Sequence, residues 1–177
     1  MKLRVGPIIA SVAVSATLLF GGWFAYKQWA VESPFENKLN QYEGVKSVQT
    51  DITQKQALVK LNLEPGTDFG SLVKQIQNDG RKWIGNRELK LEVQDNASQE
   101  LNDLWEEALF PIAQAMENKE YTGITDTLDK LREKDSNLSA KAEMDDRNVY
   151  ITLSDGQASK FIILPRVSQN MGVWPNA

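Results

Sequence analysis

The stretch QALVKLNLEPGTDFGSLVKQIQ, residues 56–77, places a strand, a turn and a helix next to one another. Its first part alternates along the chain, which predicts a strand with one buried face formed by Ala57, Val59, Leu61 and Leu63. Pro65-Gly66 ends this strand, and Thr67 or Asp68 is expected to cap the next helix. The helix carries an apolar stripe at helical spacing, namely Phe69, Leu72, Val73, Ile76 and, further on, Trp83. A strand beside an amphipathic helix predicts a mixed α+β domain.

The flanking sequence extends this unit on both sides. Residues 35–42 have the spacing of a short helix, and residues 45–52 alternate like the first strand of a hairpin that turns at 53–56. After the central helix, which is expected to fray at Gly80 and Gly85, residues 88–93 alternate cleanly between leucine or valine and charged side chains. Residues 31–95 are therefore expected to form an αββαβ module.

The remainder of the chain predicts two helices followed by a three-stranded antiparallel meander, over residues 96–166. Asn96 to Gln99 has the spacing of a capping box, and Pro111 is expected to kink or split the helix that follows. Tyr121 begins the apolar stripe of a second helix. Strands are expected at 138–144, 148–153 and 159–165, with Asp155-Gly156 as a hairpin turn and residues 167–177 as a loose tail.

The N-terminal residues predict a membrane anchor. No charge interrupts the 20 residues from Pro7 to Tyr26, which is the length that crosses a hydrocarbon core of roughly 30 Å. We expect a transmembrane segment at 7–30 and a cytoplasmic stub at 1–6, because Lys2 and Arg4 favour a cytoplasmic N-terminus. The domain beyond residue 30 would then be extracytoplasmic. The aromatic residues at the outer end, Trp23, Tyr26 and Trp29, are expected at the membrane interface.

Two other interpretations of this segment stay open. A cleaved signal peptide has a shorter apolar region and a small residue at −3 and −1 of the cleavage site. The pairs available here, Trp23/Ala25 and Gln28/Ala30, put a bulky residue at −3. A buried soluble helix is the third interpretation, although the segment has no polar face.

Composition removes several kinds of chemistry. The chain has neither Cys nor His, which excludes disulfides, thiolate nucleophiles and any Ser-His-Asp or Cys-His device. Of its 20 basic residues, three lie in the first 30, which contain no acid, so the rest of the chain holds 17 basic and 24 acidic residues, a net charge of −7. A domain this acidic is a poor nucleic-acid binder.

No catalytic, metal-binding or cofactor-binding residues emerge from the motifs. The sequence contains no phosphate loop, zinc spacing or dinucleotide fingerprint. Asp145-Asp146 and Asp155 could suggest a cation site, but aspartate is favoured in turns for its own backbone hydrogen bonds. Glu106-Glu107 is interpreted as part of a solvated helix face. We therefore expect a protein that is not an enzyme.

One cluster combines basic and aromatic residues within this acidic domain. Arg81, Lys82, Trp83 and Arg87, followed by Lys90, could receive an anionic partner such as lipid headgroups, a wall polymer or an acidic protein face. The alternative is that Trp83 packs on the core while the charges are merely solvated. The sequence leaves both interpretations open.

The αββαβ order of residues 34–95 resembles the ring-building-motif domains of bacterial envelope machines. The stretch 56–77 is also similar to the small domain of the alkaline-shock protein family, with its hydrophobic strand, Pro-Gly turn and amphipathic helix. These resemblances imply a non-enzymatic scaffold that assembles with itself or with other envelope proteins. A ligand-binding or sensory module, and a carboxylate-dependent hydrolase of wall polymers, are the alternatives.

Overall fold

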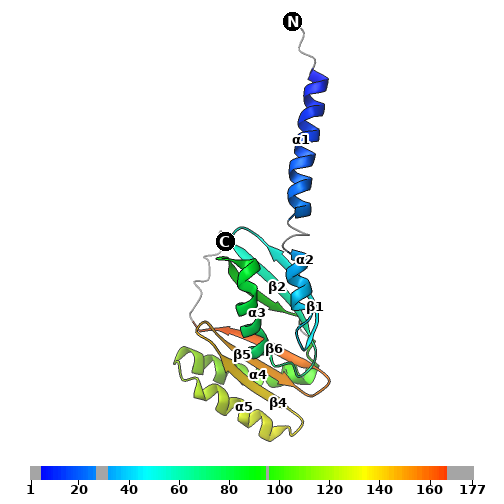
Figure 1. Ribbon diagram of the computed structural model, residues 1–177. Helices are drawn as coiled ribbons and strands as arrows, with labels where there is room; N and C mark the ends of the chain where they lie inside the picture. The colour runs from blue at the N-terminus through cyan, green and yellow to red at the C-terminus, as the bar shows by residue number, and fades with distance from the viewer. Residues whose placement is uncertain (1–4, 27–31, 95, 167–177) are drawn as a thin grey trace.

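The computed structural model describes residues 5–26, 32–94 and 96–166 and has a mixed α+β architecture (Figure 1). In chain order the elements are α1 (Val5–Tyr26), α2 (Ser33–Leu39), β1 (Val45–Ile52), β2 (Gln56–Leu63), α3 (Phe69–Ile84), β3 (Glu88–Val93), α4 (Gln99–Glu117), α5 (Thr122–Lys134), β4 (Ser139–Met144), β5 (Asn148–Ser154) and β6 (Ser159–Pro165). This confirms the predicted α+β class, the αββαβ order and the two helices before the last three strands.

The strands form two three-stranded sheets. In sheet A, with order β1-β2-β3, β2 pairs antiparallel with β1 and parallel with β3. In sheet B, with order β4-β5-β6, both pairs are antiparallel, which confirms the predicted meander. Helices α2 and α3 cover one face of sheet A, and α4 and α5 cover one face of sheet B (Figure 1).

The core of the first module lies between sheet A and the helices α2 and α3. The alternating residues Ala57, Val59, Leu61 and Leu63 are all buried, as the sequence pattern predicts. On β3, Leu89, Leu91 and Val93 are only half-buried while the charged residues between them are exposed. The predicted strand phase is therefore right, but burial is incomplete on β3 because this strand lies at the edge of the sheet.

Capping residues define both ends of helix α3. Asp68 is the N-cap, and its side chain accepts a hydrogen bond from Ser71 N at 3.2 Å. The helix does not fray at Gly80 as expected, because Gly80 is buried against the ring of Phe35 on α2. It ends at Gly85, whose φ of +61° suits glycine.

Sheet B contacts helices on both of its faces, and this joins the two halves of the domain. Tyr150 on β5 belongs to the same core as Phe69 of α3, with ring centroids 5.7 Å apart in an edge-on arrangement. The neighbouring residues Val149 and Ile151 point to the opposite face, into the core formed with α4 and α5. Because β5 is buried on both faces, three apolar residues follow one another along it, Val149, Tyr150 and Ile151.

Helix α4 differs from its prediction in two details. Its N-cap is Ser98, which accepts a hydrogen bond from Leu101 N at 3.2 Å, instead of a capping box starting at Asn96. Pro111 lies inside a single continuous helix and does not split it. Beside it, Phe110 is 80 % exposed.

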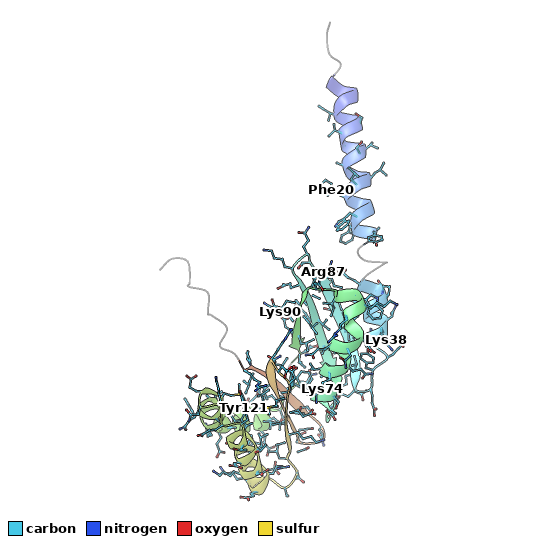
Figure 2. All side chains as sticks on the ribbon, turned by 60° about the vertical axis from the view of Figure 1, so that its left-hand side comes forward. Phe20, Lys38, Lys74, Arg87, Lys90 and Tyr121 are labelled. Carbon is cyan, nitrogen blue, oxygen red and sulfur yellow. The ribbon has the colours of Figure 1, made fainter. Side chains whose placement is uncertain are left out.

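Helix α1 stands apart from the folded domain, and its large described apolar side chains are exposed, among them Phe20 and Trp23 at 75 % and 65 % (Figures 1 and 2). The rings of Trp23 and Tyr26 lie 6.4 Å apart, whereas Trp29 lies outside the described residues. Across the described residues, no helix combines the length and the apolar character needed to cross a membrane. The described residues thus give no support to the transmembrane segment predicted at 7–30.

Candidate functional site

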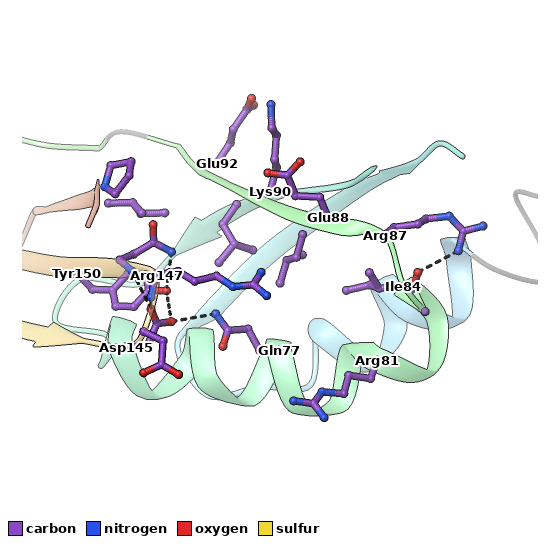
Figure 3. Close-up of a pocket in the computed structure, with 17 residues that line it drawn as sticks. Gln77, Arg81, Ile84, Arg87, Glu88, Lys90, Glu92, Asp145, Arg147 and Tyr150 are labelled. Atoms are coloured by element: carbon purple, nitrogen blue, oxygen red, sulfur yellow. Dashed lines mark hydrogen bonds between the residues drawn. The ribbon is translucent and has the colours of Figure 1, made fainter. Parts of the chain in front are cut away.

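A cleft of about 810 Å³ lies between the C-terminal half of α3, strand β3 and the neighbouring ends of sheet B (Figure 3). One wall comes from the first module, through α3 and the loop that leads into β3. The other wall comes from the β4–β5 turn and from the end of β6. The cleft therefore exists only because the two modules pack against each other.

Asp145 in the β4–β5 turn organises the floor of this cleft. Its Oδ2 accepts hydrogen bonds from Tyr150 Oη at 2.7 Å and from Gln77 Nε2 at 3.1 Å, while Asn148 Nδ2 donates to Tyr150 Oη at 3.2 Å. These four residues, the Asp145 cluster, join the turn to β5 and to α3 (Figure 3). Nearby, Arg166 Nη1 donates to the Asp145 carbonyl oxygen at 2.6 Å. The cluster is thus a structural link between the modules.

The protonation of the Asp145 cluster follows from these contacts. Partial burial alone would raise the pKa of Asp145, but the hydrogen bonds from Tyr150, from two backbone N–H groups and from Gln77 outweigh it and lower that pKa below its usual value of 3.8. Burial, reinforced by the hydrogen bond to the carboxylate, raises the pKa of Tyr150 to about 12. At neutral pH, Asp145 is therefore an anion that accepts a hydrogen bond from a neutral phenol.

Charges of both signs surround the cleft. Arg81, Lys90 and Arg147 contribute positive charge, and Glu88 and Asp146 contribute negative charge, all on exposed side chains. In Figure 3, Arg147 extends into the cleft from the sheet B side. A concave surface with both signs of charge is suited to polar complementarity with a protein surface.

The predicted basic-aromatic cluster is only partly assembled at this cleft. Arg81 and Arg87 line it, whereas Lys82 and Trp83 do not. Trp83 is half-buried and stacks on Phe35 with ring centroids 5.4 Å apart, so packing on the core is the correct interpretation for this residue. Lys82 Nζ lies 5.3 Å from the centre of the Trp83 ring.

Arg87 has a structural task that the sequence did not reveal. Its Nε donates to the Thr53 carbonyl oxygen at 2.7 Å, and its Nη1 donates to the Ile84 carbonyl oxygen at 3.0 Å. The side chain thereby joins the β1–β2 turn to the last turn of α3. Arg87 thus has a structural contact in addition to its exposed position, and its place in the predicted interaction patch stays a prediction.

A second cluster of titratable groups lies where the start of α3 meets β4. Glu143 approaches Gly70 so closely that a Cβ atom on Gly70 would lie 2.0 Å from Glu143 Oε2. Burial and the hydrogen bond with Asp68 raise the pKa of Glu143, whereas the backbone N–H of Ser71 is the main cause that lowers the pKa of Asp68. Lys74 Nζ also lies 3.8 Å from Glu143. These carboxyl groups bind the N-terminal end of α3.

The aspartates that could have suggested a cation site accept hydrogen bonds from backbone N–H groups within their own turns. Asp145 Oδ1 accepts the backbone N–H groups of Arg147 and Asn148 at 2.7 and 2.8 Å, and Asp155 Oδ1 does the same for Gln157 and Ala158 at 2.8 and 2.7 Å. Within the part of the chain that the structure describes, no three acidic side chains gather as a metal site would require.

Gln77 and Tyr150 are the cleft residues that the sequence analysis missed. A buried tyrosine in an apolar strand is one available signal, because its hydroxyl group needs a partner. Comparison of the chain with protein-family models, with curated proteins and with solved structures finds no match.

Proposed function

We propose that this protein is a single-pass membrane protein of the bacterial cell envelope whose extracytoplasmic domain docks with other envelope proteins. In this proposal it is not an enzyme and uses no cofactor. Residues 7–30 hold it in the membrane with the N-terminus in the cytoplasm. The observation that carries the docking proposal is the open cleft between the modules, with charges of both signs on its rim.

Support for the anchor comes from the sequence and from exposure. The uncharged run begins at Pro7, and part of it precedes the residues whose side chains the structure describes. The described side chains of α1 expose large apolar groups, including Leu19 at 73 %. Water is an unfavourable environment for so large an apolar surface on one isolated helix.

Docking is favoured over catalysis because the carboxyl groups that a hydrolase would need are already bound to other protein atoms. The perturbed carboxyl groups of Asp145, Asp68 and Glu143 all bind protein atoms. Asp68 and Glu143 are in direct hydrogen-bond contact, which is closer than the roughly 5–10 Å that a pair of hydrolytic carboxylates needs. The charged side chains on the cleft rim are exposed and can meet a partner.

Topology is tested by adding protease to intact cells or protoplasts. We expect residues beyond 30 to be digested without lysis, because Lys2 and Arg4 favour a cytoplasmic N-terminus. Digestion that requires lysis would reverse the orientation. A mature N-terminus near residue 26 or 31 would show a cleaved signal peptide instead of an anchor.

Docking is tested by crosslinking in intact membranes, with the double variant Lys90→Glu/Arg147→Glu. We expect this variant to lose crosslinked partners and to keep the wild-type circular dichroism spectrum, since both side chains are exposed. The variant Lys46→Glu/Lys130→Glu makes the same charge change away from the cleft and should keep them. Equal crosslinking by all three proteins would remove the cleft as the docking surface.

A further inference from the structure

We infer that one end of the domain, formed by Lys55, Arg81, Lys82 and Arg87, binds the anionic phospholipid headgroups of the membrane that holds α1. This inference rests on the proposed anchor, but it uses different side chains from the docking test at Lys90 and Arg147. These four residues are called the basic end below. Headgroup binding at the basic end would give the protein a second contact with the membrane, made by the folded domain itself.

Two segments that are separate in the sequence, the β1–β2 turn and residues 81–87, meet at the basic end. Lys55 lies in the β1–β2 turn, Arg81 and Lys82 lie in the last turn of α3, and Arg87 lies between α3 and β3. The Lys55 carbonyl oxygen accepts a hydrogen bond from Glu88 N at 3.1 Å, which fixes the β1–β2 turn beside the start of β3. The bond from Arg87 Nε to the Thr53 carbonyl oxygen at 2.7 Å joins the two segments, and the bond from Gly85 N to the Arg81 carbonyl oxygen at 2.9 Å closes the end of α3.

The chain enters the folded domain at this same end. Just before α2, Glu32 Oε1 accepts a hydrogen bond from Ile52 N at 3.0 Å, next to the β1–β2 turn. In the first turn of α2, Phe35 stacks on Trp83 in the last turn of α3. The domain therefore begins beside the basic end.

The short connection limits how far the basic end can lie from the membrane. Only five residues separate Tyr26, the last residue of α1, from Glu32, and the six residue-to-residue steps of a fully extended chain span at most about 22 Å. In Figure 2, Arg87 lies at the end of the domain next to α1, and Lys74, near the start of α3, lies farther away. An anchored α1 thus keeps the basic end close to the headgroups.

The charge of this end is opposite to that of the rest of the domain. All four basic side chains are exposed, and the acidic residues exposed near them in the chain include Asp51, Asp79 and Glu88. The two positive charges of Arg81 and Lys82 exceed the negative end of the α3 dipole, which amounts to about half a charge. A positive surface remains on a part of the chain whose net charge is −7 beyond residue 30. Anionic membrane surfaces attract such basic groups within a short distance.

The mode of binding follows from the position of Trp83. Because its ring packs on Phe35, it is not available for insertion between lipids. Recognition at the basic end is therefore electrostatic. It should depend on the headgroup charge and weaken when salt screens that charge.

The test uses the full chain in vesicles, and the absence of native Cys makes site-specific labelling clean. The substitution Asn86→Cys, in the loop of the basic end, carries a fluorophore, and the vesicles contain a lipid with a quenching nitroxide on its headgroup. The substitution Asn137→Cys, between α5 and β4, provides the matched control site. Retention of the chain in the membrane after alkaline carbonate washing is measured in the same samples.

We expect strong quenching of the fluorophore at position 86 in vesicles containing phosphatidylglycerol, weak quenching there in purely zwitterionic vesicles, and little quenching at position 137 in either. The double variant Arg81→Glu/Lys82→Glu should remove most of the quenching at position 86, and high salt should do the same when Arg81 and Lys82 are unchanged. The control variant Lys46→Glu/Lys130→Glu should keep the quenching. If the protein resists carbonate but quenching at position 86 does not change with lipid charge, salt or the Arg81→Glu/Lys82→Glu substitutions, headgroup binding is overturned and the anchor is not. Release of the protein by carbonate would overturn the anchor, and the headgroup inference with it.

Discussion

Tyr150 on β5 donates a hydrogen bond of 2.7 Å to Asp145, while its ring meets the ring of Phe69 on α3 at an angle of 89°. One side chain therefore serves both the apolar core of the first module and the polar floor of the cleft. The hydroxyl group needs a partner because Tyr150 is only 2 % exposed. The shape of the cleft thus depends on the packing between α3 and sheet B.

Asp145→Asn should destabilise the domain by about 1–3 kcal/mol at pH 7, because an amide replaces an ionised acceptor of several hydrogen bonds. The folded state lowers the pKa of Asp145, so its contribution is present above the ordinary pKa near 3.8 and is lost as pH falls through the lowered value. The difference between variant and wild type should therefore shrink in acid. Urea unfolding of the full chain in mild detergent, at pH 7 and at pH 3, measures both effects.

Asp146→Asn is the matched control, since this neighbouring residue is exposed. It should stay within about 0.5 kcal/mol of wild type. An equal loss from both substitutions would mean that the general charge of the turn matters and the Asp145 cluster does not.

Leu61→Ala should cost about 2–5 kcal/mol, because Leu61 is 1 % exposed in the centre of the first core. Leu91→Ala should cost about half as much, because this residue on the edge strand β3 is only half-buried. Lys60→Ala and Lys90→Ala, on the opposite face of sheet A, should stay within about 0.5 kcal/mol. Chemical unfolding ranks the four variants, and a lysine variant as unstable as Leu61→Ala would contradict the strand phase.

Arg87→Glu should destabilise the domain by about 1–2 kcal/mol, because its guanidinium group binds the carbonyl oxygens of Thr53 and Ile84. Arg81→Glu makes the same charge change on the same helix end and should have a much smaller effect. Thermal unfolding followed by circular dichroism compares the two. Equal melting temperatures would show that the Arg87 hydrogen bonds contribute nothing to stability.

Gly70→Ala should cost about 1–3 kcal/mol, since the new Cβ atom would lie 2.0 Å from Oε2 and 2.8 Å from Cβ of Glu143. Adding Glu143→Ala should recover part of the loss, because it removes the carboxyl group and leaves only the Cβ contact. Gly22→Ala in α1, where a Cβ atom meets nothing within 4 Å, is the control. Calorimetric melting of the single and double variants decides this, and no rescue would mean that the strain lies elsewhere.

The sequence by itself determined the secondary structure because each element carries its own local signal. Period-two alternation in ALVKLNL and ELKLEV places β2 and β3, and the apolar stripe after Asp68 places α3. The Asp155-Gly156 turn and the three last strands are equally local. Fraying at Gly80 was predicted wrongly, because a tertiary contact with Phe35 outweighs the weak helix propensity of glycine.

The cleft was decided only by tertiary structure. Its lining comes from α3, β3 and the ends of sheet B, and no sequence spacing relates Gln77 to Asp145. The separate tasks of Arg81 and Arg87 also depend on a neighbour, since only the approach of the β1–β2 turn gives Arg87 a carbonyl partner at Thr53. Periodicity reports which face of an element is apolar. Which elements meet across that face, and which polar groups they bring together, depends on packing between residues far apart in the chain.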